Sequence, residues 1–221
     1  MLAFLFALLV AQAGVTTLGN GSHLVVVLPQ TTPVKGVVLL IPGGSTLLKL
    51  GANGETRSGN FVIRTRGMLV DAGLAVAYMD NPADLSEAIQ RLRAIAKPVV
   101  VLSTSRGTIV AAQNAARLQM NGPDLLILTS PVTVGKDSLA QVNVSRIKIP
   151  TLVTTNDNDT CRASPPSGAA HLAVLIGDNA DYAHFASTEL RSDPCDAFSP
   201  HGYLGIESDV LAKIVAWITG R

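Results

Sequence analysis

Short runs of valine, isoleucine and leucine recur along this chain, and segments with helical spacing separate most of them. From Gly36 onward the runs are almost continuously apolar, as expected of parallel strands that helices cover on both faces. This order predicts an α/β fold, in which a mostly parallel, doubly wound sheet of eight strands is flanked by helices. Gly19-Asn20-Gly21-Ser22 lies between the first two runs and predicts a hairpin, so the N-terminal edge of the sheet should be antiparallel.

The predicted elements follow one another without an obvious break. Strands are expected at residues 15–18, 23–28, 36–41, 74–79, 98–102, 125–129, 150–154 and 172–176. Helices are expected at residues 61–72, 82–96, 107–120 and 206–218, where apolar side chains recur with helical spacing. No repeat, linker or low-complexity stretch divides them, so residues 14–221 are expected to form a single domain.

The N-terminal segment is apolar, and no Lys, Arg, Asp or Glu precedes Lys35. The run MLAFLFALLVA is too short to cross a bilayer as a helix, but it has the length of the apolar core of an export signal. Ala11-Gln12-Ala13 then supplies the small-x-small triplet that a signal peptidase cleaves. We therefore predict a signal peptide at residues 1–13 and an exported, periplasmic or secreted protein without stable membrane insertion. A buried N-terminal helix or a membrane anchor is the alternative.

Export changes the expected state of the two cysteines. Cys161 and Cys195 form an even pair in an oxidising compartment, which predicts a disulfide bond between them. The sequence contains no CxxC pair, Cys/His cluster, HExxH motif or Walker loop, so neither a metal nor another cofactor is expected. With 17 Lys and Arg against 16 Asp and Glu, the net charge of +1 also argues against a nucleic-acid partner.

The strongest chemical signal follows the strand expected at residues 98–102. Ser103-Thr104-Ser105-Arg106-Gly107 leads from that strand into a helix, and small-x-Ser-x-Gly in this position is the pattern of a nucleophile elbow. The turn needs small residues two before and two after Ser105, because larger side chains would collide with neighbouring backbone. The N–H of Arg106, at the helix start, could then stabilise an oxyanion. The alternative is a serine that only caps the helix.

A second oxyanion donor is expected after the strand at residues 36–41. That strand ends in Pro42-Gly43-Gly44-Ser45, a glycine-rich turn that can bring a backbone N–H close to the same oxyanion. Gly44 and Ser45 are the two choices, and Gly44 is preferred. An ordinary turn at the end of a strand is the alternative.

An acid and a base are expected near the ends of the last two strands. Asp157 and Asp159 follow the strand at residues 150–154, where a carboxylate could orient a catalytic imidazole. His184 and His201 follow the last predicted strand, where the base should lie. A disulfide between the two cysteines would tie the acid loop to the base loop, which favours Asp159 and His201 over the other pair.

The chain order Ser105, Asp159, His201 is that of α/β hydrolases, and the chain resembles that superfamily. It is similar in particular to small exported bacterial hydrolases that have Asp-x-Cys after the seventh strand and a Pro-Cys…Ser-x-His-Gly-Tyr segment. The stretches Gly59-Asn60-Phe61…Arg64 and Asp80-Asn81-Pro82-Ala83-Asp84 also look like that group. The resemblance implies Ser105 as nucleophile, His201 as general base and then acid, and Asp159 as the residue that orients it. The chain departs from the usual elbow at Ser103, where glycine is more common.

The resemblance also bears on the substrate. A lid is usually inserted after the sixth strand in this superfamily, but here only about 20 residues separate the strands expected at 125–129 and 150–154. An α/β-hydrolase fold with no lid domain and an open site is therefore expected. The expected activity is hydrolysis of a small-molecule ester or other acyl substrate by a serine esterase. The alternatives are acyl transfer, thioester or peptide hydrolysis with the same three residues, or a non-catalytic binding protein on this scaffold.

Overall fold

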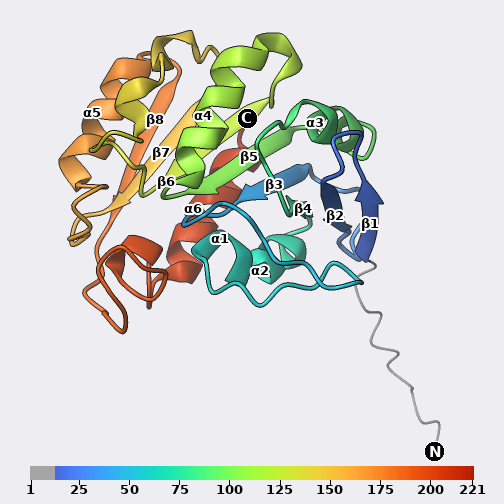
Figure 1. The fold of residues 1–221 in the computed structure, drawn as a ribbon, viewed down its shortest axis with the longest axis horizontal. Helices are drawn as coiled ribbons and strands as arrows, with labels where there is room; N and C mark the ends of the chain where they lie inside the picture. The colour runs from blue at the N-terminus through green and yellow to red at the C-terminus, as the bar shows by residue number, and fades with distance from the viewer. Residues whose placement is uncertain (1–12) are drawn as a thin grey trace, which may run out of the picture.

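The computed structural model describes residues 13–221, so the predicted signal peptide lies outside the described residues except for Ala13. An eight-stranded sheet forms its centre, in the order β1-β2-β4-β3-β5-β6-β7-β8 (Figure 1). The strands are β1 (Ala13–Thr17), β2 (His23–Val27), β3 (Val37–Ile41), β4 (Ala75–Met79), β5 (Val99–Thr104), β6 (Leu125–Thr129), β7 (Thr151–Asn156) and β8 (Ala180–Phe185). Pairing is antiparallel between β1 and β2 and between β2 and β4, and parallel elsewhere. The predicted mostly parallel sheet with an antiparallel N-terminal edge is confirmed.

Helices cover both faces of this sheet. They are α1 (Phe61–Arg64), α2 (Arg66–Asp71), α3 (Ser86–Arg93), α4 (Gly107–Leu118), α5 (Pro166–Ile176) and α6 (Glu207–Thr219). Figure 1 shows α3, α4 and α5 over one face and α1, α2 and α6 over the other. The buried apolar residues divide into two clusters that correspond to these two layers.

The central strands show why the sheet is buried on both sides. All five residues of β3 are buried, and they alternate between the two cores: Val38 and Leu40 belong to one, and Val37, Leu39 and Ile41 to the other. This period of two is that of a strand, and it leaves no polar face. The parallel strands β3, β5 and β7 therefore end at one edge of the sheet, where the loops that follow them can meet.

The strand predicted at residues 172–176 is wrong. These residues belong to α5, and the last strand is β8 at Ala180–Phe185. A short apolar run does not distinguish a strand from a buried helix, and Pro166 at the first position of α5 was the signal for a helix. Ala169, Leu172 and Ile176 are buried at helical spacing. β8 is an edge strand with mixed burial, so its sequence lacks the continuous apolar run of the inner strands.

Two predicted helices are shorter than expected. The helix predicted at residues 61–72 is divided at Thr65, whose hydroxyl donates a hydrogen bond to the carbonyl of Phe61 at 2.7 Å. The helix predicted at 82–96 begins only at Ser86, whose N–H donates to the carboxylate of Asp84 at 2.9 Å. Such side-chain bonds to backbone compete with regular helix at these points.

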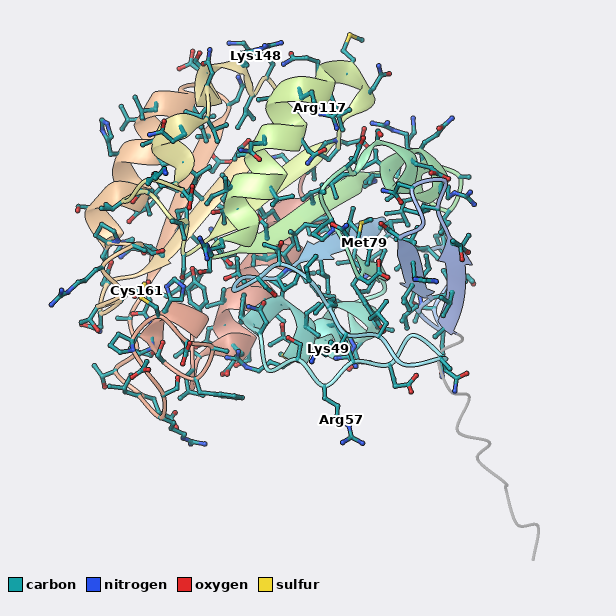
Figure 2. The ribbon with its side chains drawn as sticks, in the orientation of Figure 1. Lys49, Arg57, Met79, Arg117, Lys148 and Cys161 are labelled. Atoms are coloured by element: carbon teal, nitrogen blue, oxygen red, sulfur yellow. A yellow bond between two sulfur atoms is a disulfide. The ribbon has the colours of Figure 1, made fainter. Side chains whose placement is uncertain are left out.

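The segment between β6 and β7 holds only two short 3-10 turns, Leu139–Gln141 and Val144–Arg146, so the fold has no lid domain there. Cys161 follows β7 and lies beside the loop that leads to α6 (Figure 2). Within residues 13–221, no helix has both the length and the apolar character that a membrane span requires.

Candidate active site

Ser105 occupies the turn between β5 and α4 in a strained backbone conformation. Its φ of +53° lies in the left-handed region, which costs a residue with a side chain about 1–2 kcal/mol. Neighbouring bonds hold it there: its N–H donates to the carbonyl of Thr129 at 3.0 Å, and its own carbonyl accepts from the N–H and the hydroxyl of Thr108 at 3.0 and 2.6 Å. A strained serine between strand and helix is the geometry of a nucleophile elbow.

Two glycines allow the end of β3 to approach this turn. A Cβ on Gly43 would lie 2.7 Å from the Cβ of Ser105, and a Cβ on Gly107 would lie 2.4 Å from the carbonyl oxygen of Pro42. Neither separation is possible for real side chains, so glycine is required at both positions. Ser103 fits where glycine is usual, because its buried hydroxyl donates to the carbonyl of Ile127 at 3.0 Å.

The predicted oxyanion donors lie beside Ser105. Arg106 directly precedes α4 and has helical backbone angles, while Gly44 has a φ of +68°. In the described part of the chain, neither of their backbone N–H groups donates a hydrogen bond to another protein group. Gly44 lines both of the cavities that Ser105 lines, whereas Ser45 lines neither of them. Of the two predicted choices, Gly44 is thus the one placed next to the serine.

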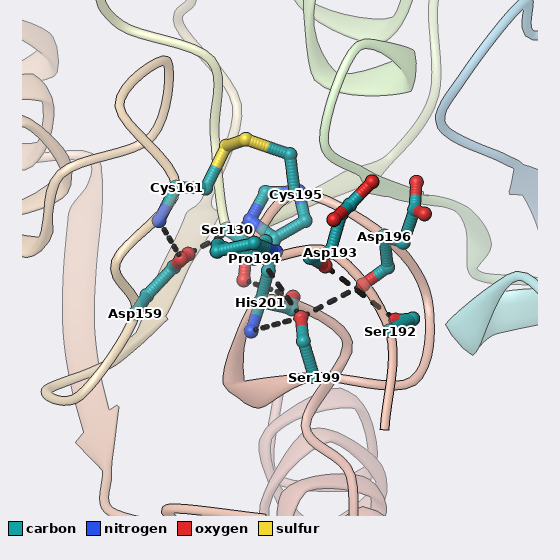
Figure 3. Close-up of a disulfide and its surroundings, with 10 residues drawn as sticks. All are labelled: Ser130, Asp159, Cys161, Ser192, Asp193, Pro194, Cys195, Asp196, Ser199 and His201. Carbon is teal, nitrogen blue, oxygen red and sulfur yellow. Dashed lines mark hydrogen bonds and ion pairs between the residues drawn. A yellow bond between two sulfur atoms is a disulfide. The ribbon is translucent and has the colours of Figure 1, made fainter. Parts of the chain in front are cut away.

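His201 and Asp159 form a buried pair. The Nδ1 atom of His201 lies 2.8 Å from Oδ2 of Asp159, and their side chains are only 4% and 0% exposed (Figure 3). The other carboxylate oxygen of Asp159 accepts the N–H of Cys161 at 2.8 Å. The Nε2 atom of His201 has no hydrogen-bond partner among residues 13–221. His201 and Ser105 line the same cavity of about 360 Å³, so the structure brings all three predicted residues to one place.

The second predicted pair also forms, but elsewhere. Nδ1 of His184 lies 2.7 Å from Oδ2 of Asp157, with side chains 63% and 46% exposed. His184 lies within β8 rather than after it, and it does not line the cavity of Ser105. The two pairs therefore share their hydrogen-bond geometry and differ in burial and in access to the serine.

The disulfide predicted between Cys161 and Cys195 is confirmed, with a Cα–Cα distance of 4.6 Å. It joins the loop after β7, which carries Asp159, to the loop before α6, which carries His201 (Figure 3). Cys195 also lines the cavity of Ser105. The covalent bond thus holds together the two segments that carry Asp159 and His201.

Removing this disulfide is expected to destabilise the protein. Replacing both Cys161 and Cys195 with alanine should lower the free energy of unfolding by about 2–5 kcal/mol, because the unfolded chain regains the freedom of the closed loop. Urea denaturation of the double variant and of the oxidised wild type measures the difference. Wild-type protein treated with a reductant should match the variant. An unchanged free energy of unfolding would contradict the expectation.

A network of buried hydroxyl groups next to His201 was not predicted from the sequence. The Tyr203 hydroxyl accepts the N–H of Ser130 at 3.1 Å and is bonded to the hydroxyl of Thr154 at 2.8 Å. The Ser130 hydroxyl donates to the carbonyl of His201 at 2.8 Å. Burial raises the pKa of the Tyr203 phenol far above its ordinary value, so it stays protonated. The available signal was a polar residue after β6 and another near the end of β7, both beside apolar runs.

Replacing Tyr203 with phenylalanine is expected to lower the free energy of unfolding by about 1–3 kcal/mol, because the buried N–H of Ser130 loses its acceptor. Tyr182→Phe is the matched control: this ring is 40% exposed, and in the described part of the chain its hydroxyl makes no hydrogen bond. Urea denaturation compares the two variants. Equal stability of the two would refute a role for the hydroxyl network.

Among the comparisons with known proteins, the one with solved structures identifies the fold. The sequence matches no protein-family model, and no curated protein matches it. A sugar hydrolase from Lactococcus lactis is similar in structure, with a TM-score of 0.66 and 14% identity, over 94% of this chain and 97% of that one. A fungal esterase from Rhizomucor miehei gives a TM-score of 0.63 and 13% identity, over 95% and 82% of the two chains. An α/β serine hydrolase without lid from Xanthomonas campestris gives 0.62 and 15%, over 93% and 95%. At these identities the likeness establishes the fold, which is that of α/β hydrolases.

Proposed function

We propose that this chain is a carboxylic ester hydrolase that acts through an acyl-enzyme on Ser105. One observation carries the proposal: the strained Ser105 shares a cavity with His201, whose Nδ1 is held by the buried carboxylate of Asp159. The Nε2 atom of the same ring is unpaired among the described residues and is the atom that would take the serine proton. The α/β-hydrolase fold supports the proposal of hydrolase chemistry, and the residues of the site supply a mechanism for it.

The proposed reaction has two halves. The Oγ of Ser105 attacks the ester carbonyl carbon while Nε2 of His201 accepts the hydroxyl proton. The N–H groups of Arg106 and Gly44 bind the resulting oxyanion, and Asp159 stabilises the imidazolium. The carbon–oxygen bond to the alcohol then breaks, and His201 gives its proton to the departing alcohol. Water, activated by the same imidazole, finally releases the acid and restores Ser105.

The surroundings of the site bear on the kind of substrate and on the compartment. The segment between β6 and β7 holds only two short 3-10 turns and Ser105 is partly exposed, which favours a small-molecule ester that reaches an open site. The disulfide is of the kind that persists in oxidising compartments. We therefore extend the proposal to a periplasmic or secreted enzyme in which residues 14–221 form the working domain.

Labelling with a fluorophosphonate probe tests this proposal. The wild-type protein is expected to gain one probe adduct, located on Ser105 by peptide mass spectrometry, because only an activated serine reacts at an appreciable rate. Protein denatured before addition of the probe is the control and should remain unlabelled. A folded wild type that fails to react would refute the proposal and favour a binding protein on this scaffold.

A further inference from the structure

Asn60 has an unused side-chain amide at the start of α1. Its backbone carbonyl accepts the N–H groups of Ile63 and Arg64 at 3.0 and 2.8 Å, but its side chain makes no capping bond. An asparagine in this position normally accepts a helix N–H with its side chain. Here the Oδ1 atom is buried and has no partner among residues 13–221. A buried polar atom without a partner costs free energy, so its presence needs a reason other than stability.

The amide lies next to the nucleophile. Asn60 lines the same cavity as Ser105 and His201. Its Nδ2 atom and the Cβ of Ser105 both lie within 3.3 Å of the point that a Cβ on Gly43 would occupy. Because Oδ1 is shielded, the Nδ2 end is the end that the cavity reaches. Turning the amide over would exchange the two atoms and still leave one polar atom facing the cavity.

The backbone that carries Asn60 is firmly held. The guanidinium of Arg64 donates to the carbonyl of Gly59 at 3.0 Å and to the carbonyl of Gly202 at 2.7 Å, and it pairs with Glu207 at 2.8 Å. Gly59 precedes Asn60, and Gly202 follows His201. The Arg64 guanidinium thus links the backbone next to Asn60 to the backbone next to His201, and such fixed positions are the preorganisation that substrate recognition requires.

Two cavities meet at Ser105, and their linings differ. The alcohol-side cavity, as we name it, holds about 360 Å³ and includes the polar side chains of Asn60, Ser192, Asp196 and His201. The acyl-side cavity holds about 410 Å³ and is not lined by His201; its lining combines apolar residues with charged ones, among them Val132, Val134, Ala163, Arg106, Lys136 and Asp137. His201 must protonate the leaving alcohol, so the alcohol has to depart on the side where this ring lies. The acyl group is then left with the other cavity.

We infer that the alcohol-side cavity takes a hydroxyl-rich alcohol, such as a glyceryl or sugar group, and that the amide of Asn60 hydrogen-bonds one of its oxygens. This inference rests on the proposed ester hydrolysis. Ser192 and Asp196 offer a hydroxyl and a carboxylate to further hydroxyl groups of the same alcohol. A site built to hydrogen-bond a substrate hydroxyl discriminates against the analogue that lacks it, because its own polar groups are then left unpaired.

Two butyrate esters test the inference. Glyceryl monobutyrate and propyl butyrate share the acyl group and the three-carbon alcohol skeleton, and differ in two hydroxyl groups. The wild type is expected to favour the glyceryl ester by about 10-fold or more in kcat/KM. Asn60→Leu, similar in size but apolar, should bring this ratio towards one, because the hydrogen bond to the hydroxyl-bearing alcohol is lost. Its melting temperature should equal or exceed that of the wild type, because the unpaired Oδ1 is gone.

The outcomes separate this inference from the proposed function. A wild type that neither reacts with the fluorophosphonate nor hydrolyses either ester overturns both. A wild type that labels but cleaves the two esters equally, or cleaves neither, overturns the inference alone. A folded Asn60→Leu variant that keeps the wild-type ratio also overturns it, and a lowered melting temperature with that ratio identifies a structural role. Asn60→Ala replaces the leucine variant if that one does not fold. The ratio of kcat/KM for the two esters in the wild type tests the preference for a hydroxyl-rich alcohol without any variant.

Discussion

Ser105→Ala is expected to lower kcat for a short p-nitrophenyl ester by about 10⁴-fold or more. The substitution removes the oxygen that would form the acyl-enzyme and keeps the Cβ, so the packing against Gly43 is retained. Any remaining rate would come from the oxyanion donors and from binding alone. Steady-state kinetics measure the effect, with circular dichroism to show that the variant is folded. A folded variant with undiminished turnover would rule out Ser105 as the nucleophile.

The backbone strain at this residue provides a second readout for the same position. Ser105→Gly should be as inactive as Ser105→Ala, but more stable than it by about 1 kcal/mol, since glycine adopts a positive φ without the steric penalty. The gain is partly offset by the greater freedom of glycine in the unfolded chain. Urea denaturation of the two inactive variants compares them directly. Equal stabilities would show that the turn carries no strain.

Much of the scaffold follows from patterns that the sequence displays openly. The nearly continuous apolar runs of β3 to β6 predict strands that are covered on both faces, and the small residues around Ser105 predict a tight turn at the end of one of them. Part of α5 is predicted as a strand and β8 is missed, because an edge strand loses the apolar run, while a helix against the sheet can contain one. Local sequence therefore identifies elements best where burial is complete on both sides.

The parts of the site that escaped prediction depend on contacts distant in sequence. Nothing in the sequence around Tyr203 indicates that its hydroxyl contacts Ser130, which follows β6, and Thr154, which lies in β7. The sequence indicates Asn60 only as part of the stretch Gly59-Asn60-Phe61…Arg64, because an asparagine before a helix is ordinarily a cap. Its unusual state becomes visible only when Gly43 and Ser105 are placed beside it.

His201→Ala and His184→Ala together test which histidine is the base, and they are expected to differ by about 10⁴-fold in kcat. Each ring is held by an aspartate through Nδ1, at 2.8 Å for His201 and 2.7 Å for His184, so removing either breaks an equivalent bond. Only His201 shares a cavity with Ser105, and only its pair with Asp159 is buried. The alanine variant of His184 should therefore keep its activity, and steady-state kinetics on one p-nitrophenyl ester compares the two.

The aspartates extend the same comparison. Asp159→Asn should lower kcat by about 10⁴-fold, because an amide favours the wrong tautomer of His201 and cannot stabilise its charged form. Asp157→Asn alters an exposed pair away from the cavity and should leave kcat unchanged. If kcat instead fell in the His184 and Asp157 variants, the base would lie on β8, and the buried His201–Asp159 pair would not activate Ser105. The two histidine–aspartate pairs have similar hydrogen bonds and differ in burial. The four single substitutions therefore test whether activity depends on a pair that lies close to Ser105 or on any histidine–aspartate pair.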